Sequence, residues 1–315
     1  MTQRGRRIIT VILLTGFLVG TLMALYPDIA DYWNRMHQAQ AIYTYADTVS
    51  NLNDEDYEAI WQEALDYNEA MSQKGTMWAM TDEEREEYNA LLNVDGTGNM
   101  GYIDIPKIGV TLPMYHGTTE SVLQTSVGHI EGTSLPCGSR DYNDDVTRPV
   151  WGSHSVLSGH RGLPSAKLFS DLDQLVEGDI FILTVLDQTL TYEVDQIRIV
   201  EPSDVSALAI EPEMDLCTLV TCTPYGVNTH RLLVRGHRVE NDRKTDIRLT
   251  ADAMRIQPMF VAPYLAIPVL VILVIWMMIV TSRGHVRRKR QREQERRQEI
   301  RETLFSPEEE DREGK

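Results

Sequence analysis

The sequence predicts a mainly β domain, closed into a barrel or stacked as a sandwich, with a helical region before it and a membrane-spanning helix on either side. The chain of 315 residues contains two long uncharged segments. The region between them begins with helical spacing of apolar residues and continues as short β-rich runs separated by Gly, Pro, Asn and Asp. With 42% hydrophobic residues, the composition excludes general disorder.

The first uncharged segment runs from Ile8 to Tyr26 and follows an arginine-rich amino terminus, residues 1–7. As a helix it would be about 28 Å long, which is close to the thickness of a bilayer core. A cleaved signal peptide is the alternative, but a signal peptide needs small residues at its cleavage site, and Met23-Ala24-Leu25-Tyr26 fits poorly. We therefore expect residues 8–26 to be an uncleaved anchor.

The second uncharged segment, residues 259–282, contains 24 residues, too many for a typical buried core helix, which is the alternative. A charged tail, residues 283–315, follows it and begins with a basic cluster. Because basic residues flank the outer end of both segments, we expect two crossings of the plasma membrane with both termini in the cytoplasm. The region between them would then be extracellular.

The region between the two segments is strongly acidic: residues 28–258 hold 16 of the 30 basic and 38 of the 47 acidic residues. The net charge of the whole chain is −17. Nucleic-acid binding requires a basic surface, so this balance argues against a nucleic-acid partner.

Residues 28–98 are predicted to form a helical extension. Apolar residues recur there at steps of three and four, and Lys74-Gly75-Thr76 divides the region in two. Thr81, with Glu84 three residues later, predicts a helix amino terminus with a capping box.

Residues 99–245 are predicted to form the β domain. Its candidate strands are Gly101–Ile105, Val150–Ser158, Ile180–Val185, Leu190–Ile197, Cys217–Thr221 and Arg231–Val239. A hairpin turn is expected near Gln188-Thr189. Strands this short and this closely spaced favour a barrel or a sandwich.

Two apparent ligand motifs carry little weight. Residues 96–101 match G-x-G-x-x-G, but the dinucleotide fingerprint needs a strand before it and a helix after it, and the order here is reversed. The acidic run at residues 141–145 lacks the spacing of a calcium loop, so we interpret it as a solvated loop. No zinc motif occurs in the sequence, and we expect neither a metal nor a cofactor.

The stretch from Thr218 to Arg238 carries the most chemistry. A β run ends at Cys222, a turn follows, and a second β run starts at Arg231. A fixed cation near a thiol favours the nucleophilic thiolate, and Arg can stabilise an oxyanion. A buried structural cysteine is the alternative, and Cys217 is expected to be one, because residues five apart on a strand point to opposite faces.

An acid is also needed to protonate the leaving group. His160, in Ser158-Gly159-His160-Arg161-Gly162, and His116 both lie at tight bends beside β runs. Periodicity alone does not choose between them.

The combined motifs resemble the sortase family. Thr218–Arg238 is similar to the signature around the sortase nucleophile, and Ser158–Gly162 is similar to the sortase histidine motif. Residues 101–106, 112–118 and 127–136 are also similar to this family. The subfamily resembled is the class C, pilus-assembling sortase, whose members carry a helical extension and a second membrane helix.

The resemblance implies a closed sortase-type β-barrel and a catalytic triad of Cys222, His160 and Arg231. It further implies cleavage of a Leu-Pro-x-Thr-Gly-like sorting signal and transfer of the acyl fragment to a pilin lysine, which polymerises pili. The partners would be pilin precursors with such a signal and an acceptor lysine. Thr221, Ser158 and Asn228, from the same motifs, are candidates for the substrate groove.

Two alternatives remain at this point. One is a sortase that anchors surface proteins to peptidoglycan, and the other is an inactive membrane-anchored binding module. The sequence also departs from the class C pattern, because the lid motif Asp-Pro-aromatic is absent. Trp78, in residues 75–80, is the candidate for the aromatic residue of a lid; packing of helix on barrel is its alternative role.

Overall fold

A computed structural model describes residues 3–139, 151–241 and 293–301 of the chain. The chain divides into two compact units, residues 23–254 and residues 1–22 together with 255–315. The larger unit contains the β domain and the helices that pack on it. In the smaller unit the described residues are the beginning of the first helix and a helix at 293–301.

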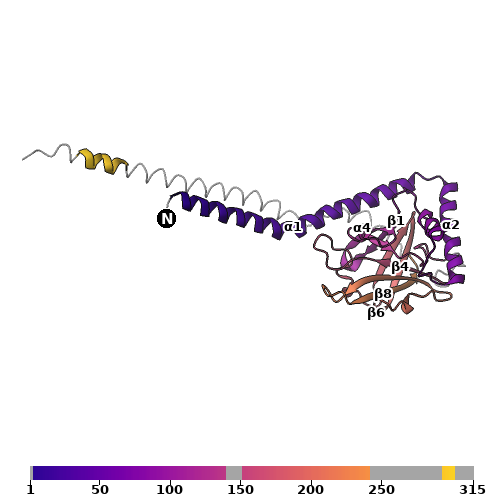
Figure 1. Ribbon diagram of the computed structural model, residues 1–315. Helices are drawn as coiled ribbons and strands as arrows, with labels where there is room; N and C mark the ends of the chain where they lie inside the picture. Colours follow the sequence, from indigo (N-terminus) through magenta and orange to yellow (C-terminus); the bar gives the residue numbers. More distant parts are fainter. Residues whose placement is uncertain (1–2, 140–150, 242–292, 302–315) are drawn as a thin grey trace, which may run out of the picture. The chain divides into compact units, whose positions relative to one another are not determined.

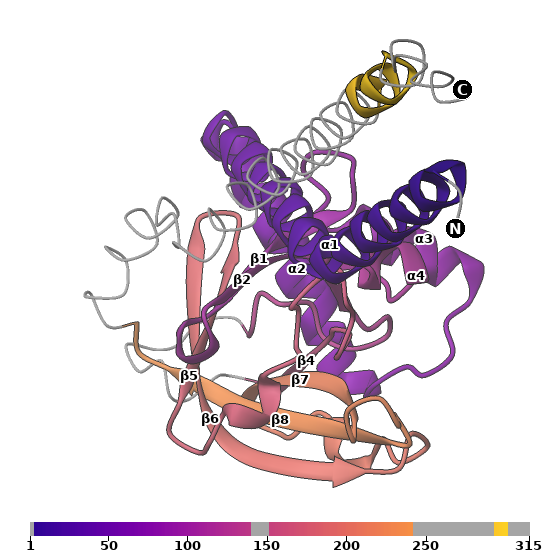
Figure 2. The same ribbon diagram turned by 90° about the vertical axis from the view of Figure 1, so that its left-hand side faces the viewer.

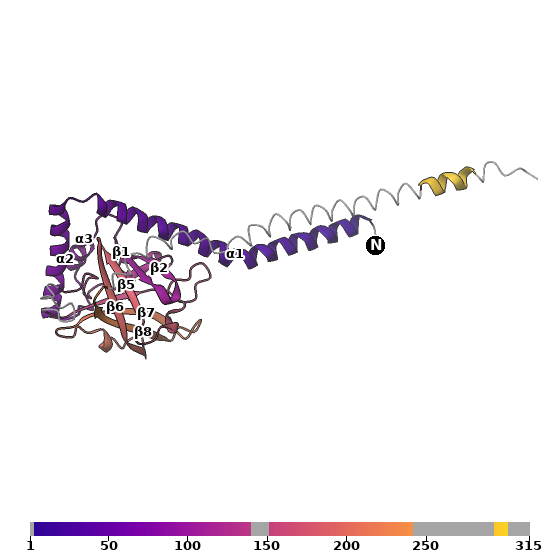
Figure 3. The same ribbon diagram turned by 180° about the vertical axis from the view of Figure 1, so that it is seen from behind.

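The β domain is a closed barrel with the strand order β1-β2-β3-β4-β7-β8-β6-β5 (Figure 1). Figure 2 and Figure 3 show the long strands β6 and β8 side by side along one part of it. The closed barrel that the family resemblance implied is therefore confirmed, and the sandwich, which the strand pattern had left open, is wrong. Its strands are β1 (Asn99–Ile105), β2 (Val110–His116), β3 (Val127–His129), β4 (Ser153–Ser158), β5 (Ile180–Val185), β6 (Gln188–Val200), β7 (Asp215–Thr223) and β8 (His230–Val239).

Two strands were not predicted, β2 and β3. Pro113 interrupts the β-rich pattern of β2, and β3 has three residues with Gly128 in its centre. The hairpin between β5 and β6 turns at residues 186–187, two residues before the predicted position, because Val185 pairs with Gln188. His116 is the last residue of β2 rather than part of a bend.

The barrel interior is apolar. Ile103, Leu183, Leu219 and Val234, from four different strands, are fully buried in one cluster. Strands β4 and β7 are buried on both faces, because Leu208 and neighbouring side chains cover their outer side. Close packing on both faces makes these two strands a rigid support for the residues at their ends.

Helices α1 (Gln3–Ser50), α2 (Asp54–Lys74) and α3 (Asp82–Ala90) precede the barrel, and the short α4 (Glu120–Leu123) follows β2. The predicted break at Gly75 and the capping box of Thr81 and Glu84 are confirmed. The break between α1 and α2, where Asn53 caps α2, was not predicted.

The predicted anchor at residues 8–26 lies within α1. Among the described residues, α1 is the one helix long and apolar enough to cross a membrane. The predicted second crossing at residues 259–282 and the acidic loop at residues 141–145 lie outside the described residues.

Buried hydrogen bonds hold the helical extension on the barrel. The Tyr45 hydroxyl donates to the Met100 carbonyl oxygen at 2.9 Å and accepts from the Leu186 amide at 2.8 Å. On α2, the fully buried Asn68 amide donates to the Gly138 carbonyl oxygen at 2.8 Å and accepts from the Leu135 amide at 2.6 Å. Leaving such groups unpaired would destabilise the protein, so these contacts fix the helices in place.

Two buried histidines make the stability of the fold depend on pH. Burial lowers the pKa of His129 to about 3 and the pKa of His154 to about 4. Both are therefore neutral in the fold, whereas the unfolded chain protonates them below about pH 6.5. The contribution of these two neutral histidines to the free energy of unfolding is complete above that pH. It is lost as the pH falls towards the pKa values that the histidines have in the folded protein.

We expect the free energy of unfolding to fall between pH 7 and pH 5, with a slope of up to about 1.4 kcal/mol per pH unit for each histidine. Urea titrations of the detergent-solubilised chain measure it. His129→Gln should reduce the slope, whereas His230→Gln, at an exposed position, should leave it unchanged. A free energy that is constant between pH 7 and pH 5 would contradict this assignment.

Candidate active site

Three strand ends meet at one rim of the barrel. Strands β4 and β7 are parallel, with Ser158 opposite Val220, so their carboxyl-terminal ends lie together. Strand β8 is antiparallel to β7, and Cys222 near the end of β7 lies opposite Arg231 near the start of β8. His160 follows β4 by two residues. The topology thus brings His160, Cys222 and Arg231 to the same rim.

The loop that carries His160 is tied directly to β7. The Gly159 amide donates to the Val220 carbonyl oxygen at 3.1 Å, and the buried Thr221 hydroxyl donates to the Gly159 carbonyl oxygen at 2.7 Å. A Cβ at Gly159 would lie 2.7 Å from the Phe169 ring, so this close approach requires glycine. The position of His160 relative to Cys222 is therefore set by backbone contacts to the strand that carries the thiol.

Glu120 on α4 approaches His160 and was not found from the sequence. Its Oε2 lies 3.7 Å from the His160 Nε2, and the His160 side chain is 28% exposed. The Glu120 carboxylate therefore lies within ion-pairing distance of the His160 ring. Glu120 lies forty residues before His160 in the sequence and stands in no recognised motif. The sequence therefore gave no indication that the two residues are in contact.

The three cysteines differ in their exposure. Cys137 and Cys217 are fully or almost fully buried, and burial raises the pKa of both thiols. Cys222 is partly exposed. Strand alternation places Cys217 and Cys222 on opposite faces, as predicted. Since the thiolate is the nucleophile, Cys222 is the cysteine suited to react with a substrate.

The Arg231 side chain lies along the start of β8. Its Nη1 donates to the carbonyl oxygens of Asn228 at 3.3 Å and His230 at 3.1 Å. In the part of the chain that the structure describes, the Arg231 guanidinium forms no ion pair with a carboxylate. Its other N–H groups remain available to a substrate carbonyl or an oxyanion.

The three groove candidates lie in different environments. Ser158 is partly exposed at the end of β4, between Gly128 and Val220. Asn228 is exposed in the β7–β8 turn, where its backbone is left-handed with φ of 61°. Thr221 is 2% exposed and hydrogen-bonded to the His160 loop, so its side chain holds that loop rather than forming an open surface.

Arg161, next to His160, links both sides of the rim and was not singled out from the sequence. Its Nη1 donates to the Thr223 hydroxyl at 3.3 Å, its Nη2 pairs with Asp173, and its guanidinium lies 5.9 Å from the centre of the Tyr225 ring. The side chain is 9% exposed. Arg161 therefore joins the His160 loop to the residues that follow Cys222.

We expect Arg161→Lys to lower kcat about tenfold with little change in KM, because lysine cannot reproduce the planar contacts that align His160 with Cys222. A steady-state assay with the sorting-signal peptide that the sequence resemblance implies measures this. Arg235→Lys is the control, since Arg235 forms ion pairs with Asp195 and Glu211 elsewhere on the barrel. If Arg161→Lys and Arg235→Lys lowered kcat equally, the loss would come from lower stability of the fold and not from misalignment of His160.

The candidate lid residue Trp78 is 48% exposed. The segment around it is anchored on the β3–β4 loop, where the Met77 amide donates to the Gly132 carbonyl oxygen at 2.8 Å. Gly132 has φ of +78°, and a Cβ there would lie 1.8 Å from the Met77 carbonyl oxygen.

Among the described residues, no group of three or more His, Cys, Asp and Glu side chains is placed to hold a metal ion.

The chain matches known proteins over the barrel. The family model described as a sortase domain matches residues 103–239. Sortase D of Bacillus subtilis is 31% identical over 142 residues, which cover 44% of this chain and 63% of that protein. The chain spans less than two thirds of the length of the curated relatives that it matches.

Solved structures match over a longer region. Sortase C1 of Streptococcus agalactiae is 55% identical, with a TM-score of 0.60 over 64% of this chain and 100% of that chain. Sortase C of Clostridium perfringens, solved with the C-terminal cell wall sorting motif, is 38% identical, with a TM-score of 0.54 over 64% of this chain and 100% of that chain. The chain therefore belongs to the sortase family of cysteine transpeptidases, and the structures it resembles place it with class C.

Proposed function

We propose that this protein is a membrane-anchored transpeptidase that cleaves a Leu-Pro-x-Thr-Gly-like sorting signal and joins the acyl fragment to a pilin lysine. The observation that carries the proposal is the meeting of His160, Cys222 and Arg231 at one rim, with Cys222 the partly exposed cysteine. In this assignment residues 99–245 are the catalytic domain and residues 28–98 are an extension that supports it.

In the first half-reaction the Cys222 thiolate attacks the threonine carbonyl carbon of the sorting signal. Arg231 donates hydrogen bonds to the oxyanion of the tetrahedral intermediate, where such donors act most strongly. The bond between threonine and glycine then breaks. His160 gives its proton to the departing glycine amine, and the threonine acyl group remains on the sulfur as a thioester.

In the second half-reaction an amine attacks the thioester carbon. His160, now neutral, takes a proton from the nitrogen of the attacking amine. The Cys222 thiolate then leaves as the new amide bond forms. One amide bond has been exchanged for another, so no nucleoside triphosphate is needed. Water must be kept from the thioester, because hydrolysis would release a free threonine carboxylate instead of the amide.

A reconstituted reaction tests the acceptor. The detergent-solubilised chain would be mixed with a pilin precursor that carries the sorting signal, and the products separated in SDS. The proposal expects a ladder of SDS-resistant species and an isopeptide bond between threonine and a lysine, mapped by mass spectrometry. Transfer to a peptidoglycan amine with no pilin ladder would support a cell-wall-anchoring sortase and contradict the pilin part of the proposal. The absence of any acyl transfer would support a binding module.

Trp78 is assigned here to a lid that lies over the nucleophile. We expect Trp78→Ala to raise the rate at which a thiol reagent labels Cys222 by about threefold or more, because the ring would no longer restrict access. Mass spectrometry of the native chain measures this selectively, since Cys137 and Cys217 are buried. Trp33→Ala, at another exposed tryptophan, is the control. An unchanged labelling rate would mean that Trp78 does not cover Cys222.

The membrane topology is also a proposal: a crossing at residues 8–26, a second at residues 259–282, and both termini in the cytoplasm. The support is the apolar part of α1 and the basic residues that flank both segments on their outer ends. Protease treatment of intact protoplasts should remove the catalytic domain and leave tags at both termini protected. Digestion of the carboxyl-terminal tag would contradict the second crossing.

A further inference from the structure

One side of α1 is polar where the helix passes the barrel. Asp31, Asn34 and Gln38 are spaced by three and four residues, so their side chains lie on the same face of the helix. Gln38 is 7% exposed although it is polar. Further along this face Tyr45 and Val49 are buried. Polar side chains that a helix turns towards the protein are expected to form specific hydrogen bonds there.

Two of these side chains bind the main chain of the loop that carries His160. The Asn34 Nδ2 donates to the Ser165 carbonyl oxygen at 2.8 Å, and the Lys167 amide donates to the Asp31 Oδ1 at 3.0 Å. Both bonds go to backbone atoms of the loop. They therefore fix the path of the loop and not only the position of one of its side chains.

The segment held by α1 is joined directly to His160. The Phe169 amide donates to the His160 carbonyl oxygen at 3.1 Å, and the Phe169 side chain is fully buried. Leu168, between Lys167 and Phe169, is 1% exposed and has a left-handed backbone with φ of 40°. Because close-packed residues transmit displacement, a shift of Lys167 would move the backbone of His160.

The same face of α1 also holds the segment that carries Glu120. The Gln38 Nε2 donates to the Thr125 carbonyl oxygen at 2.6 Å, two residues after the end of α4. The Glu120 Oε2 in turn lies 3.7 Å from the His160 Nε2. One helix face is thus bound to the loop that carries His160 and to the segment that approaches its ring.

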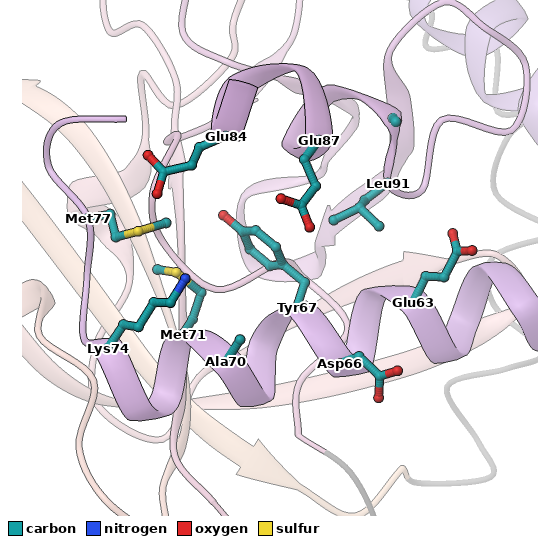
Figure 4. Close-up of a pocket in the computed structure, with 11 residues that line it drawn as sticks. Glu63, Asp66, Tyr67, Ala70, Met71, Lys74, Met77, Glu84, Glu87 and Leu91 are labelled. Atoms are coloured by element: carbon teal, nitrogen blue, oxygen red, sulfur yellow. The ribbon is translucent and has the colours of Figure 1, made fainter. Parts of the chain in front are cut away.

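Helices α2 and α3 contact each other differently. Figure 4 shows the side chains of Tyr67 and Met71 on α2 and of Leu91 on α3 in the space between these two helices. Apolar packing of this kind has no preferred direction, whereas a hydrogen bond to a carbonyl oxygen fixes a distance and an angle. In the described part of the chain, the hydrogen bonds from the helical extension to the His160 loop come from α1.

We propose that Asp31, Asn34 and Gln38 are positioning residues for acyl transfer, which hold the His160 ring at the distance from Cys222 that proton transfer requires. Their hydrogen bonds go to the main chain of the two segments, so they act through those segments. The inference rests on the proposed function, because it concerns the proton that His160 gives to the departing glycine amine and takes from the acceptor amine. A displacement of about 1 Å at a catalytic group can cost about 100-fold in rate, so we expect about tenfold for the loss of one such bond.

The test compares two substrates of the full chain in detergent. A Leu-Pro-x-Thr-Gly peptide needs His160 to protonate the leaving amine, whereas a p-nitrophenyl ester of Leu-Pro-x-Thr releases p-nitrophenolate, which leaves without a proton. We expect Asn34→Ala and Gln38→Ala each to lower kcat for the peptide about tenfold, with KM within about twofold of the parent. The burst of p-nitrophenolate from the ester should keep its rate within about twofold.

Gln40→Ala is the matched control, because it removes the same amide from an exposed position of α1, where the amide donates to Thr44 on the same helix. Its kcat should stay within about twofold of the parent value. A fall in the ester rate as large as the fall in kcat for the peptide would show a loss of folded enzyme and overturn the inference.

Asp31 allows a rescue by a conservative variant. Asp31→Asn keeps an oxygen that accepts from the Lys167 amide but loses the ion pair with Arg35, and a partly exposed pair of this kind contributes little. We expect Asp31→Ala to lower kcat for the peptide about tenfold and Asp31→Asn to stay within about twofold of the parent. Equal kcat values in these two variants would overturn positioning through the hydrogen bond.

The two substrates also separate this inference from the proposed function. If the parent chain cleaves the peptide and Asn34→Ala and Gln38→Ala match Gln40→Ala, the positioning role is wrong and the proposed function stands. If the parent chain releases p-nitrophenolate from the ester but leaves the peptide uncut, the proposed function is wrong and the inference fails with it.

Discussion

Cys222→Ala is expected to abolish acyl transfer, with a loss of at least about 10³-fold in the rate of cleavage of a sorting-signal peptide. The sulfur forms the covalent intermediate, and removal of a nucleophile eliminates the route through it. Release of the glycine-bearing fragment, followed by chromatography, measures the rate. The expected loss lies in kcat, because alanine leaves the groove that binds the peptide almost unchanged.

Cys137→Ala is the matched control for this variant. Cys137 is 3% exposed, and its sulfur accepts a hydrogen bond from the Asn68 amide at 3.2 Å. Its replacement should lower stability but leave the cleavage rate within about threefold of the parent. The assignment of the nucleophile would be wrong if Cys222→Ala kept a tenth of the activity, or if Cys137→Ala lost as much.

Arg231→Lys is expected to lower kcat by about 10²–10³-fold, which is the typical effect of removing one oxyanion donor. Lysine retains the positive charge but lacks the fork of N–H groups, so a donor that must be aimed at the oxyanion is lost. The dissociation constant of the peptide, measured in the Cys222→Ala background, should change much less than kcat. The comparison separates stabilisation of the transition state from binding of the substrate.

His230→Gln provides the control for Arg231, because His230 precedes it on β8 and is exposed. We expect its kcat to stay within about threefold of the parent value. A fall in peptide affinity as large as the fall in kcat for Arg231→Lys would assign the arginine to substrate binding alone and contradict its role at the oxyanion.

The sequence predicted the parts of the fold whose signals are local. Strand β5 was placed at Ile180–Val185, its observed bounds, because a continuous β-rich run is bounded there by turn residues. The capping box at Thr81 is equally local, since both hydrogen bonds join residues three apart. Strand β3 was missed because three residues carry no periodicity, and its pairing with β2 and β4 is decided by tertiary contacts.

The residues of the candidate site divide in the same way, into those that local motifs predict and those that only tertiary contacts reveal. Cys222, His160 and Arg231 stand in compact motifs that resemble those of a known family, so the sequence alone nominated them. Glu120 and Arg161 were not nominated, because Glu120 contacts His160 and Arg161 contacts Thr223 across long stretches of the chain. Thr221 was expected to line the groove from its place in the motif, but strand alternation next to the partly exposed Cys222 turns its side chain inwards.

The most direct test of the central claim is the mass of the trapped acyl-enzyme. The chain would be incubated briefly with a Leu-Pro-x-Thr-Gly peptide without an amine acceptor, quenched in acid and digested for mass spectrometry. The account predicts an adduct that ends at the threonine, attached through a thioester to Cys222 and removed by hydroxylamine. An adduct on another residue, or cleavage of the peptide without any adduct on Cys222, would contradict it.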